Sequence, residues 1–438
     1  MKELELYLTN LLGKEKTKEL FDSFDNDAYS AVRINKIKTD VGYIKNFFDL
    51  KKETLLDYGF IFDKKNINLG KNIYHKAGLY YIQEPSAMYV GSLLDVKETD
   101  KVLDLCAAPG GKSTHIAMKM NNKGLVVSND VGYNRATELS YNIERMGLSN
   151  CLVTSMDVDF FASSFEGYFD KVILDAPCSG LGMIRKNDLS KTDWNINKVN
   201  KLSSIQKDLI LKAYKCLKKD GVLLYSTCTF TKEENEEVIQ YLLDNTNASI
   251  LPIELKKGIE EGFIKGSIRI YPSSFEGEGH FACMIQCNDD HKITKKYPLK
   301  ETNYHTVDIY RSWEKDNLNC KLEGFFVNFD GHLYLLNNPL FNLDKIKVLR
   351  AGLYLGEIVK NRFVPSHSLA MFLKKEDFKQ VLLLDSNSNE IDSFLKGMTL
   401  AIPYQKNYVL VCVDGFPIGL GKADQGILKN LLPKGLRL

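Results

Sequence analysis

The strongest constraint on the fold is a regular alternation of two patterns between residues 101 and 226. Short runs rich in Val, Ile and Leu are separated by stretches with amphipathic, helical spacing. Such runs are typical of strands buried on both faces, with helices that cross over between parallel neighbours. We therefore expect an α/β block that extends to about Cys287, with strands at residues 101–105, 124–128, 151–154, 171–174 and 221–226.

Composition and charge place the chain among ordinary globular proteins. Its 438 residues are enough for about two to four domains. The formal net charge of +2 argues against a histone-like or polybasic protein. No run approaches the roughly 20 apolar residues that cross a bilayer. Acidic residues within residues 1–12 favour an amphipathic helix over a signal peptide, so we expect no membrane segment.

The cysteines indicate a reducing environment. There are nine, an odd number, and several lie in apolar, strand-like text, which argues against a disulfide framework. Reduced thiols favour a cytoplasmic protein. Cys283 and Cys287 lack a second pair at zinc-ligand spacing, so we expect no bound metal.

Composition changes along the chain predict five segments. Residues 1–77 mix helical and strand-like text, which predicts a small α+β N-terminal domain, and residues 78–288 hold the alternating block. A polar, Lys-rich stretch at 289–304 is typical of a linker. The remainder is mixed and aromatic and ends in a Gly-rich, strand-like stretch; we divide it into 305–370 and 371–438.

The first chemically informative segment spans residues 102–113, where a strand leads through a glycine-rich turn into a helix. Gly110 and Gly111 allow a ligand to approach the backbone, and the helix start offers unpaired N–H groups. The segment is a poor Walker loop, because Cys106 stands where that pattern requires its first glycine and Pro109 removes an N–H donor. The turn therefore predicts a ligand site that does not require a triphosphate.

Two acids follow at the ends of later strands. Asp130 lies 19 residues after Gly111, where doubly wound domains place the carboxylate that binds ribose hydroxyls. Asp157, after the third strand, is placed to hold an adenine amino group in the same crevice. Together they favour an adenosine cofactor; S-adenosylmethionine fits, and a nicotinamide dinucleotide is the competitor. Taken singly, each acid is about as often a cap at a strand end.

Two further strands each end in a turn that carries a cysteine. One ends in Asp175-Ala-Pro-Cys178 and the next in Ser-Thr-Cys228. The carboxyl ends of parallel strands open onto one crevice, so adjacent strands would bring both thiols to the same bound group. Thr231 and Glu234 match a capping box, which predicts a helix directly after Cys228 and a more nucleophilic thiol.

A cysteine is ordinarily a small buried residue. Two thiols and an acid in polar turns instead favour a reactive site, and one reaction fits them. C5 of cytosine is too weak a nucleophile to attack a methyl sulfonium directly. Addition of a thiolate to C6 gives C5 enamine character, and an acid at the N3/N4 edge stabilises that addition. Asp175 is placed to be this acid, and Cys178 is a candidate for the second group near C5 that assists release.

Three motifs, Asp104-Leu-Cys-Ala-Ala-Pro-Gly-Gly-Lys112, Asp175-Ala-Pro-Cys-Ser-Gly180 and Ser226-Thr-Cys-Thr229, resemble those of RNA cytosine-5 methyltransferases of the Nop/Sun (Fmu) type. The resemblance covers about residues 78–287 and implies a Rossmann-like class I methyltransferase core. It implies that Cys228 is the nucleophile and that Cys178 serves product release. The related DNA enzymes use their Pro-Cys thiol as nucleophile, so the reversed assignment is an alternative, which the Thr227-Cys228 pattern disfavours.

The resemblance also implies the cofactor and the residues that hold it. The methyl donor is S-adenosylmethionine, and the positions carried over are Cys106, Ala107, Ala108, Pro109, Gly110, Gly111, Lys112, Asp130, Asp157 and Asp175. Cys106 stands beside two alanines and is more typical of a structural residue than of a reactive thiol.

The tail has a narrower resemblance. Segments 350–356, 362–370 and 429–437 are similar to the C-terminal region of bacterial 16S ribosomal RNA methyltransferases of the RsmF type. This implies an RNA-binding N-terminal domain and a PUA-like C-terminal α+β/β module. The near-zero net charge does not itself support RNA binding, which rests on the motifs and on the base-directed thiol chemistry.

We therefore predict an S-adenosylmethionine-dependent RNA cytosine-C5 methyltransferase that forms 5-methylcytidine in 16S rRNA. Its expected partner is RNA, either 16S rRNA or the small ribosomal subunit, and we expect a monomer. Transfer RNA is the alternative substrate. A non-catalytic rRNA-binding assembly protein and a Rossmann-type dehydrogenase are the alternatives from other classes; the first has no need of two site thiols.

Overall fold

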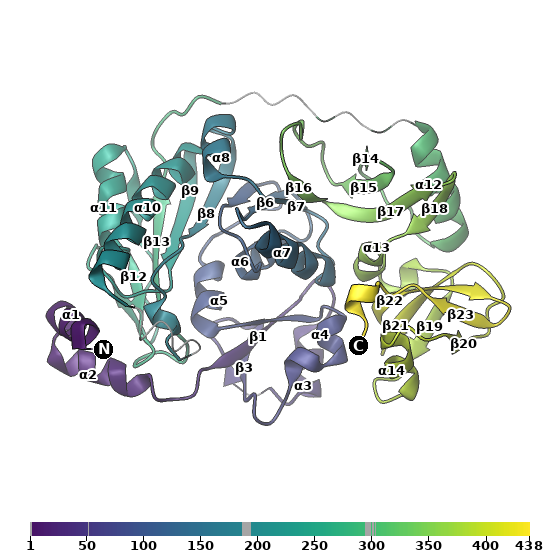
Figure 1. The fold of residues 1–438 in the computed structure, drawn as a ribbon, viewed down its shortest axis with the longest axis horizontal. Coiled ribbons are helices and arrows are strands. Elements are labelled where there is room, and N and C mark those ends of the chain that lie inside the picture. The colour runs from purple at the N-terminus through teal and green to yellow at the C-terminus, as the bar shows by residue number, and fades with distance from the viewer. Residues whose placement is uncertain (1, 51, 186–193, 294–298, 300–301, 303) are drawn as a thin grey trace.

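The computed structural model describes residues 2–50, 52–185, 194–293, 299, 302 and 304–438 (Figure 1). Its centre is a sheet of ten strands. Five of them are parallel: β5 (Lys101–Asp104), β6 (Leu125–Asn129), β7 (Cys151–Thr154), β8 (Phe169–Asp175) and β9 (Leu217–Thr227). All five strands predicted from the alternating pattern are present, which confirms the α/β class.

Antiparallel strands extend this sheet at both edges. They are β10 (Ser249–Leu251), β11 (Ile259–Glu261), β12 (Ile268–Ile270), β13 (His280–Gln286) and β16 (Val348–Ala351). The order across the sheet is β11-β12-β13-β9-β8-β5-β6-β7-β16, and β10 pairs with β13. The sequence did not predict β16, which comes from the C-terminal third of the chain and closes the edge beside β7.

Helices cover both faces of the sheet. The helices on one face are α5 (Pro85–Ser92), α6 (Gly111–Lys119) and α7 (Tyr133–Arg145). Those on the other are α8 (Val158–Ser164), α10 (Ile196–Lys215) and α11 (Glu236–Asn245). Each face buries its own cluster of Leu, Val and Ile side chains, as expected for parallel strands between two helical layers.

The N-terminal part forms a small α+β unit, as predicted. It contains α1 (Lys2–Leu12), α2 (Lys14–Ser23), β1 (Ser30–Ile34), α3 (Val41–Phe47), β2 (Lys52–Glu53), β3 (Gly59–Phe62), the 3₁₀ helix Leu69–Lys71, α4 (Ile73–Lys76) and β4 (Tyr80–Gln83). The sheet order is β2-β3-β1-β4. Arg33 on β1 is fully buried and donates to Gly111 O at 2.7 Å and to Thr114 Oγ1 at 2.6 Å. This residue ties the N-terminal unit to the glycine turn.

The C-terminal part has two further sheets, ordered β14-β15-β17-β18 and β19-β21-β22-β23-β20. The first belongs with α12 (Tyr304–Asn317), β14 (Phe325–Phe329), β15 (His332–Leu336), β17 (Leu353–Val359), β18 (Arg362–Pro365) and α13 (His367–Phe372). The second belongs with β19 (Val381–Leu384), α14 (Asn389–Leu395), β20 (Leu400–Ala401), β21 (Tyr408–Val413), β22 (Phe416–Asp424) and β23 (Ile427–Asn430). Half of the predicted linker at 289–304 lies outside the described residues.

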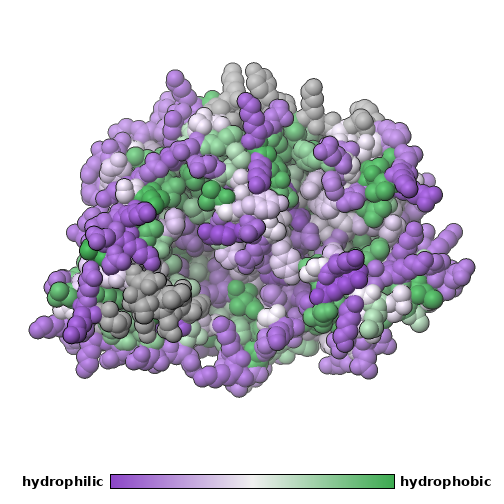
Figure 2. Space-filling view, in the orientation of Figure 1, coloured by the Kyte–Doolittle hydropathy of each residue, from purple (hydrophilic) through white to green (hydrophobic). Residues whose placement is uncertain are grey.

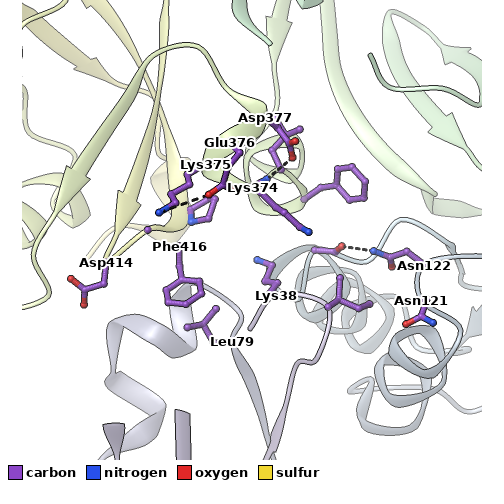
Figure 3. Close-up of a pocket in the computed structure, with 16 residues that line it drawn as sticks. Lys38, Leu79, Asn121, Asn122, Lys374, Lys375, Glu376, Asp377, Asp414 and Phe416 are labelled. Atoms are coloured by element: carbon purple, nitrogen blue, oxygen red, sulfur yellow. Dashed lines mark hydrogen bonds and ion pairs between the residues drawn. The ribbon is translucent and has the colours of Figure 1, made fainter. Parts of the chain in front are cut away.

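The last sheet packs against the part of the N-terminal unit that holds β1–β4, so these two parts of the chain lie side by side (Figure 1). Tyr43 and Phe416 have ring centroids 5.4 Å apart. A cavity of about 490 Å³ opens at this junction, and Figure 3 shows Lys38 and Lys374 among its lining. Lys38 Nζ donates to Ala77 O at 2.7 Å, and burial lowers its pKa to about 7. Neither Cys178 nor Cys228 contributes to this cavity.

Figure 2 shows hydrophilic side chains over most of one face, with smaller apolar areas between them. In the described part of the chain, every helix is too short or too polar to cross a membrane.

Candidate active site

A second cavity, of about 300 Å³, lies at the carboxyl ends of β5, β8 and β9, where β13 begins. The glycine turn and β4 close its other sides. It is lined by Tyr81, Ile82, Gln83, Glu84, Ala87, Asp104, Cys106, Ala107, Ala108, Pro109, Gly111, Lys112, Asp175, Met183, Cys228 and His280. Three of the sequence motifs therefore meet in one place, which the topology explains because their strands are neighbours.

The two predicted site thiols are in contact. β8 and β9 pair in parallel with Asp175 opposite Ser226, so the turns that follow them lie side by side. Cys178 Sγ is 3.2 Å from Cys228 Sγ. The hydrogen bond to Cys228 and burial raise the pKa of Cys178 well above its ordinary value, so Cys178 keeps its proton. Only Cys228 of the pair lines the cavity.

Glu234 holds the Cys178 turn in place. Its buried carboxylate accepts hydrogen bonds from Ser179 N at 2.8 Å, Ser179 Oγ at 2.5 Å and Gln206 Nε2 at 3.1 Å. Thr231 Oγ1 donates to the same carboxylate at 2.8 Å. The prediction of a helix directly after Cys228 was wrong: α11 begins at Glu236. The Thr-x-x-Glu pattern is real, but its glutamate bonds across to the β8 turn.

Asp175 is held by two partners in the cavity wall. Lys112 Nζ lies 2.7 Å from its Oδ2, and Ser226 Oγ donates to its Oδ1 at 2.6 Å. Burial alone favours the neutral acid, but the charge of Lys112, the electrostatic interaction with His280 and these hydrogen bonds outweigh it and hold the pKa of Asp175 below its ordinary value. Asp175 is therefore a carboxylate beside the nucleophile candidate.

The glycine turn forms the wall opposite the thiols. Gly110 has φ of 112°, in the left-handed region that favours glycine, and α6 begins at the next residue. A Cβ on Gly111 would lie 2.9 Å from Gln83 Nε2. Cys106 lines the cavity, and burial raises its pKa to about 12, consistent with a structural thiol.

Asp104 is a further acid that lines the cavity, and the sequence did not predict it as a site residue. Ser113 Oγ donates to its Oδ2 at 2.7 Å, whereas Oδ1 is buried with no hydrogen-bond partner among the described residues. Burial raises the pKa of Asp104 to about 7. An unpartnered carboxylate oxygen at a cavity fits a cationic ligand such as S-adenosylmethionine. The sequence signal that could have identified Asp104 was its position at the end of the first parallel strand.

The other two predicted cofactor acids lie outside the cavity lining. Asp130 is buried; its Oδ2 lies 3.3 Å from Ala108 N and 3.2 Å from Arg135, and Gly132 N donates to its Oδ1 at 3.0 Å. Asp130 therefore supports the turn from behind. Asp157 is exposed and caps α8 by accepting from Asp159 N at 2.9 Å. Their cofactor contacts stay predictions.

Sequence models of known families cover almost the whole chain in four consecutive parts. Residues 3–85 match the N-terminal domain of 16S rRNA methyltransferase RsmF, and residues 91–286 match 16S rRNA methyltransferase RsmB/F. Residues 312–373 match the first C-terminal domain of RsmF rRNA methyltransferase, and residues 381–438 match the methyltransferase RsmF PUA domain.

Solved structures share the fold. A methyltransferase homologue from Pyrococcus horikoshii is 28% identical with a TM-score of 0.58, over 64% of this chain and 93% of that one. NSun6 from the same organism, determined with SFG, is 23% identical with a TM-score of 0.61, over 66% of this chain and 99% of that one.

Curated relatives match over most of the chain. Ribosomal RNA small subunit methyltransferase F of Vibrio vulnificus is 32% identical over 93% of this chain and 90% of its own length. The protein of the same name from Psychromonas ingrahamii is 31% identical over 84% of this chain and 81% of its own. With the thiol pair, the glycine turn and all four domain matches in agreement, the chain belongs to the ribosomal RNA small subunit methyltransferase F family of RNA methyltransferases.

Proposed function

We propose that this protein forms 5-methylcytidine in the 16S rRNA of the small ribosomal subunit, with S-adenosylmethionine as methyl donor and Cys228 as nucleophile. The contact of 3.2 Å between Cys178 Sγ and Cys228 Sγ beside Asp175 carries the proposal. A nucleophile and a carboxylate in one cavity, with a second thiol in contact with the nucleophile, are what C5 methylation of cytosine requires.

The cavity supports the role of Cys228 in the first step. Cys228 lines the cavity, whereas Cys178 does not, and the two sulfur atoms are in hydrogen-bond contact. Cys228 adds to C6 of the base, and the electron pair that reaches C5 makes that carbon nucleophilic. Asp175, held by Lys112 and Ser226, is placed to hydrogen-bond the N3/N4 edge of the base.

Cys178 acts in the last step. After the methyl group has reached C5, the C5 proton passes to water, the C5–H electron pair forms the C5–C6 double bond, and the bond between C6 and Cys228 Sγ breaks with its electron pair returning to the sulfur. The Cys178 thiol, which keeps its proton because its pKa is raised, donates a hydrogen bond to the departing sulfur. Without this donor the covalent protein–RNA adduct should persist.

The cofactor is held on the glycine-turn side. Asp104, Ala107, Ala108 and Pro109 present a carboxylate and backbone to the space. S-adenosylmethionine, when bound there, supplies an electrophilic methyl group. Lys112 connects this side of the cavity to Asp175 through an ion pair of 2.7 Å.

The RNA must deliver an unstacked cytidine to the cavity. We propose that residues 1–77 and the PUA-like module at 371–438 bind the surrounding RNA, and that residues 289–304 connect the catalytic domain to the tail. The protein acts as a monomer in the cytoplasm, where ribosomal RNA is found and its free cysteines stay reduced.

Substitution of each thiol tests the proposal. We expect Cys228→Ala to abolish methylation while the protein still binds S-adenosylmethionine, and Cys178→Ala to accumulate an adduct that survives denaturant on a gel. Cys320→Ala, in the C-terminal part, is the control and should methylate normally. Bisulfite sequencing of ribosomal and transfer RNA from cells with and without the protein identifies the target.

Two results would contradict the proposal. Methylation by Cys228→Ala would remove Cys228 as nucleophile, and an adduct trapped by Cys228→Ala would mean that the two thiols have exchanged roles. A loss of 5-methylcytidine from transfer RNA alone would move the substrate away from the small subunit.

A further inference from the structure

His280, the first residue of β13, stands beside Cys228 at the end of the central sheet. β13 pairs antiparallel with β9, with Ala282 opposite Ser226 and Phe281 opposite Thr227. One further step along this register sets His280 opposite Cys228. Directly opposite residues present their side chains on the same face, with Cβ atoms about 5 Å apart. Both side chains accordingly line the same cavity.

A buried network fixes the imidazole from behind. Ser86 Oγ lies 2.6 Å from His280 Nδ1 and 2.5 Å from Glu84 Oε2. Glu84 also accepts from three backbone groups, Ser86 N at 2.7 Å, Ala87 N at 2.8 Å and Glu278 N at 2.6 Å. Such a carboxylate acts only as an acceptor.

The network decides which ring nitrogen carries the proton. Ser86 has a single hydroxyl proton, and it must go to Glu84, because Glu84 has none to donate. Ser86 Oγ is then the acceptor for His280 Nδ1–H, which leaves the basic lone pair on Nε2. A histidine in this tautomer, oriented by an acceptor on its far side, has the arrangement of a base that serves a neighbouring nucleophile.

We propose that His280 is the base that takes the proton of the Cys228 thiol when the sulfur attacks the pyrimidine. The inference rests on the proposed function and adds a catalytic residue to it. The S–H bond of Cys228 breaks, the proton moves to His280 Nε2, and the sulfur electron pair forms the bond to C6. When that bond breaks, the sulfur electron pair returns to Cys228, and the imidazolium gives its proton back to this sulfur or to water.

The charges around His280 favour the imidazolium that forms. Glu84, the N-cap residue of α5, lies 3.8 Å from Nδ1. Asp175 faces it from β8, and the interaction between the two is among the causes that lower the pKa of Asp175. Two cations lie nearby: Lys112, in the same cavity, is paired with Asp175 at 2.7 Å, and Arg185 is paired with Glu278 at 3.1 Å. Each of these cations is therefore compensated by a carboxylate, and Glu84 stays as the acid beside the imidazole.

Alkylation of Cys228 by iodoacetamide, followed by mass spectrometry in the absence of RNA, tests the base directly. In His280→Gln we expect the alkylation rate of Cys228 at neutral pH to fall and to recover as the pH rises. Methylation kcat should fall on the order of 100-fold, with KM for RNA little changed. Ser86→Ala should lower both rates by a smaller factor, because the imidazole loses its orientation. His332→Gln, which alters a half-exposed histidine in the C-terminal part, is the control.

Binding of S-adenosylmethionine, measured by calorimetry, shows that each variant is folded. If His280→Gln and a second variant, His280→Asn, alkylate at the wild-type rate across the pH range, His280 is not the base. If Cys228 loses reactivity in both variants while the wild-type protein methylates no RNA, the base assignment stands and the proposed function fails.

Discussion

At the scale of single residues, two carboxyl groups on adjacent strands of the site have pKa values shifted in opposite directions. Asp175 faces Lys112 and stays ionised, whereas Asp104 is buried with one hydroxyl donor, and its pKa rises to about 7. The difference in charge partners explains the opposite shifts. Asp175 is therefore an acceptor at neutral pH, whereas Asp104 changes between acid and anion near pH 7.

The state of Asp104 predicts a pH-dependent affinity for S-adenosylmethionine. Below about pH 7 the acid holds a proton that a cationic cofactor must displace, so binding should tighten as the pH rises through that value. Calorimetry in two buffers of different ionisation enthalpy should detect the released proton. Asp104→Asn should bind more weakly and without this dependence; Asp159→Asn, on α8, is the control. Affinity that is flat with pH in the unmodified protein would contradict the prediction.

We expect Glu234 to stabilise the folded protein through its hydrogen bonds to the Cys178 turn and its neighbours. Glu234→Ala leaves the buried donors of Ser179, Gln206 and Thr231 without their acceptor, which should cost at least about 2 kcal/mol in the free energy of unfolding. Urea denaturation measures this cost. Glu237→Ala, on the exposed side of α11, should change little, and equal stability of the two variants would refute the role assigned to Glu234.

At the scale of elements, the position of β16 decides how the tail is attached. It pairs antiparallel with β7 and covers an edge that would otherwise expose unpaired backbone groups. Arg350 on β16 is buried, forms an ion pair with Glu144 of α7, and donates to Ser368 Oγ at 2.9 Å. The tail is thereby part of the catalytic sheet and not a separate appendage.

Loss of the Arg350 side chain should loosen this attachment. Arg350→Ala leaves Glu144 largely buried without its cation, and we expect a cost of about 3 kcal/mol in unfolding free energy. The double variant Arg350→Met with Glu144→Leu should recover much of it, because no charge stays unpaired. Thermal unfolding compares the variants; a double variant as unstable as Arg350→Ala would contradict this account.

At the scale of the whole molecule, the N-terminal unit and the last sheet close around the catalytic domain. Residues from both ends share one buried cluster, and Tyr74 of α4 donates a hydrogen bond to Asp414 after β21. The two units expected to bind RNA are therefore held relative to each other and to the cavity.

The contact between Tyr43 and Phe416 should measure the coupling of the two ends. Aromatic pairs of this kind contribute about 0.5–1.5 kcal/mol beyond the area they bury. A double-mutant cycle with Tyr43→Leu and Phe416→Leu, followed by urea denaturation, should give a coupling energy in this range. The same cycle on Tyr43 with Phe161, which lies in the core of the catalytic domain, should give none. Additive effects in the first cycle would mean that the ends unfold independently.

The sequence by itself determined the parallel strands, the glycine turn, the two cysteine turns and the family, because each depends on residues a few positions apart. Tertiary structure alone decided the contact between the two thiols and the hydrogen bonds of Glu234 to the Cys178 turn. It also brought Asp104 and His280 to the cavity and β16 to the edge of the sheet. These depend on register between strands that lie up to about 200 residues apart. A local pattern specifies which residues end a strand, but only the packed sheet specifies which strand ends meet.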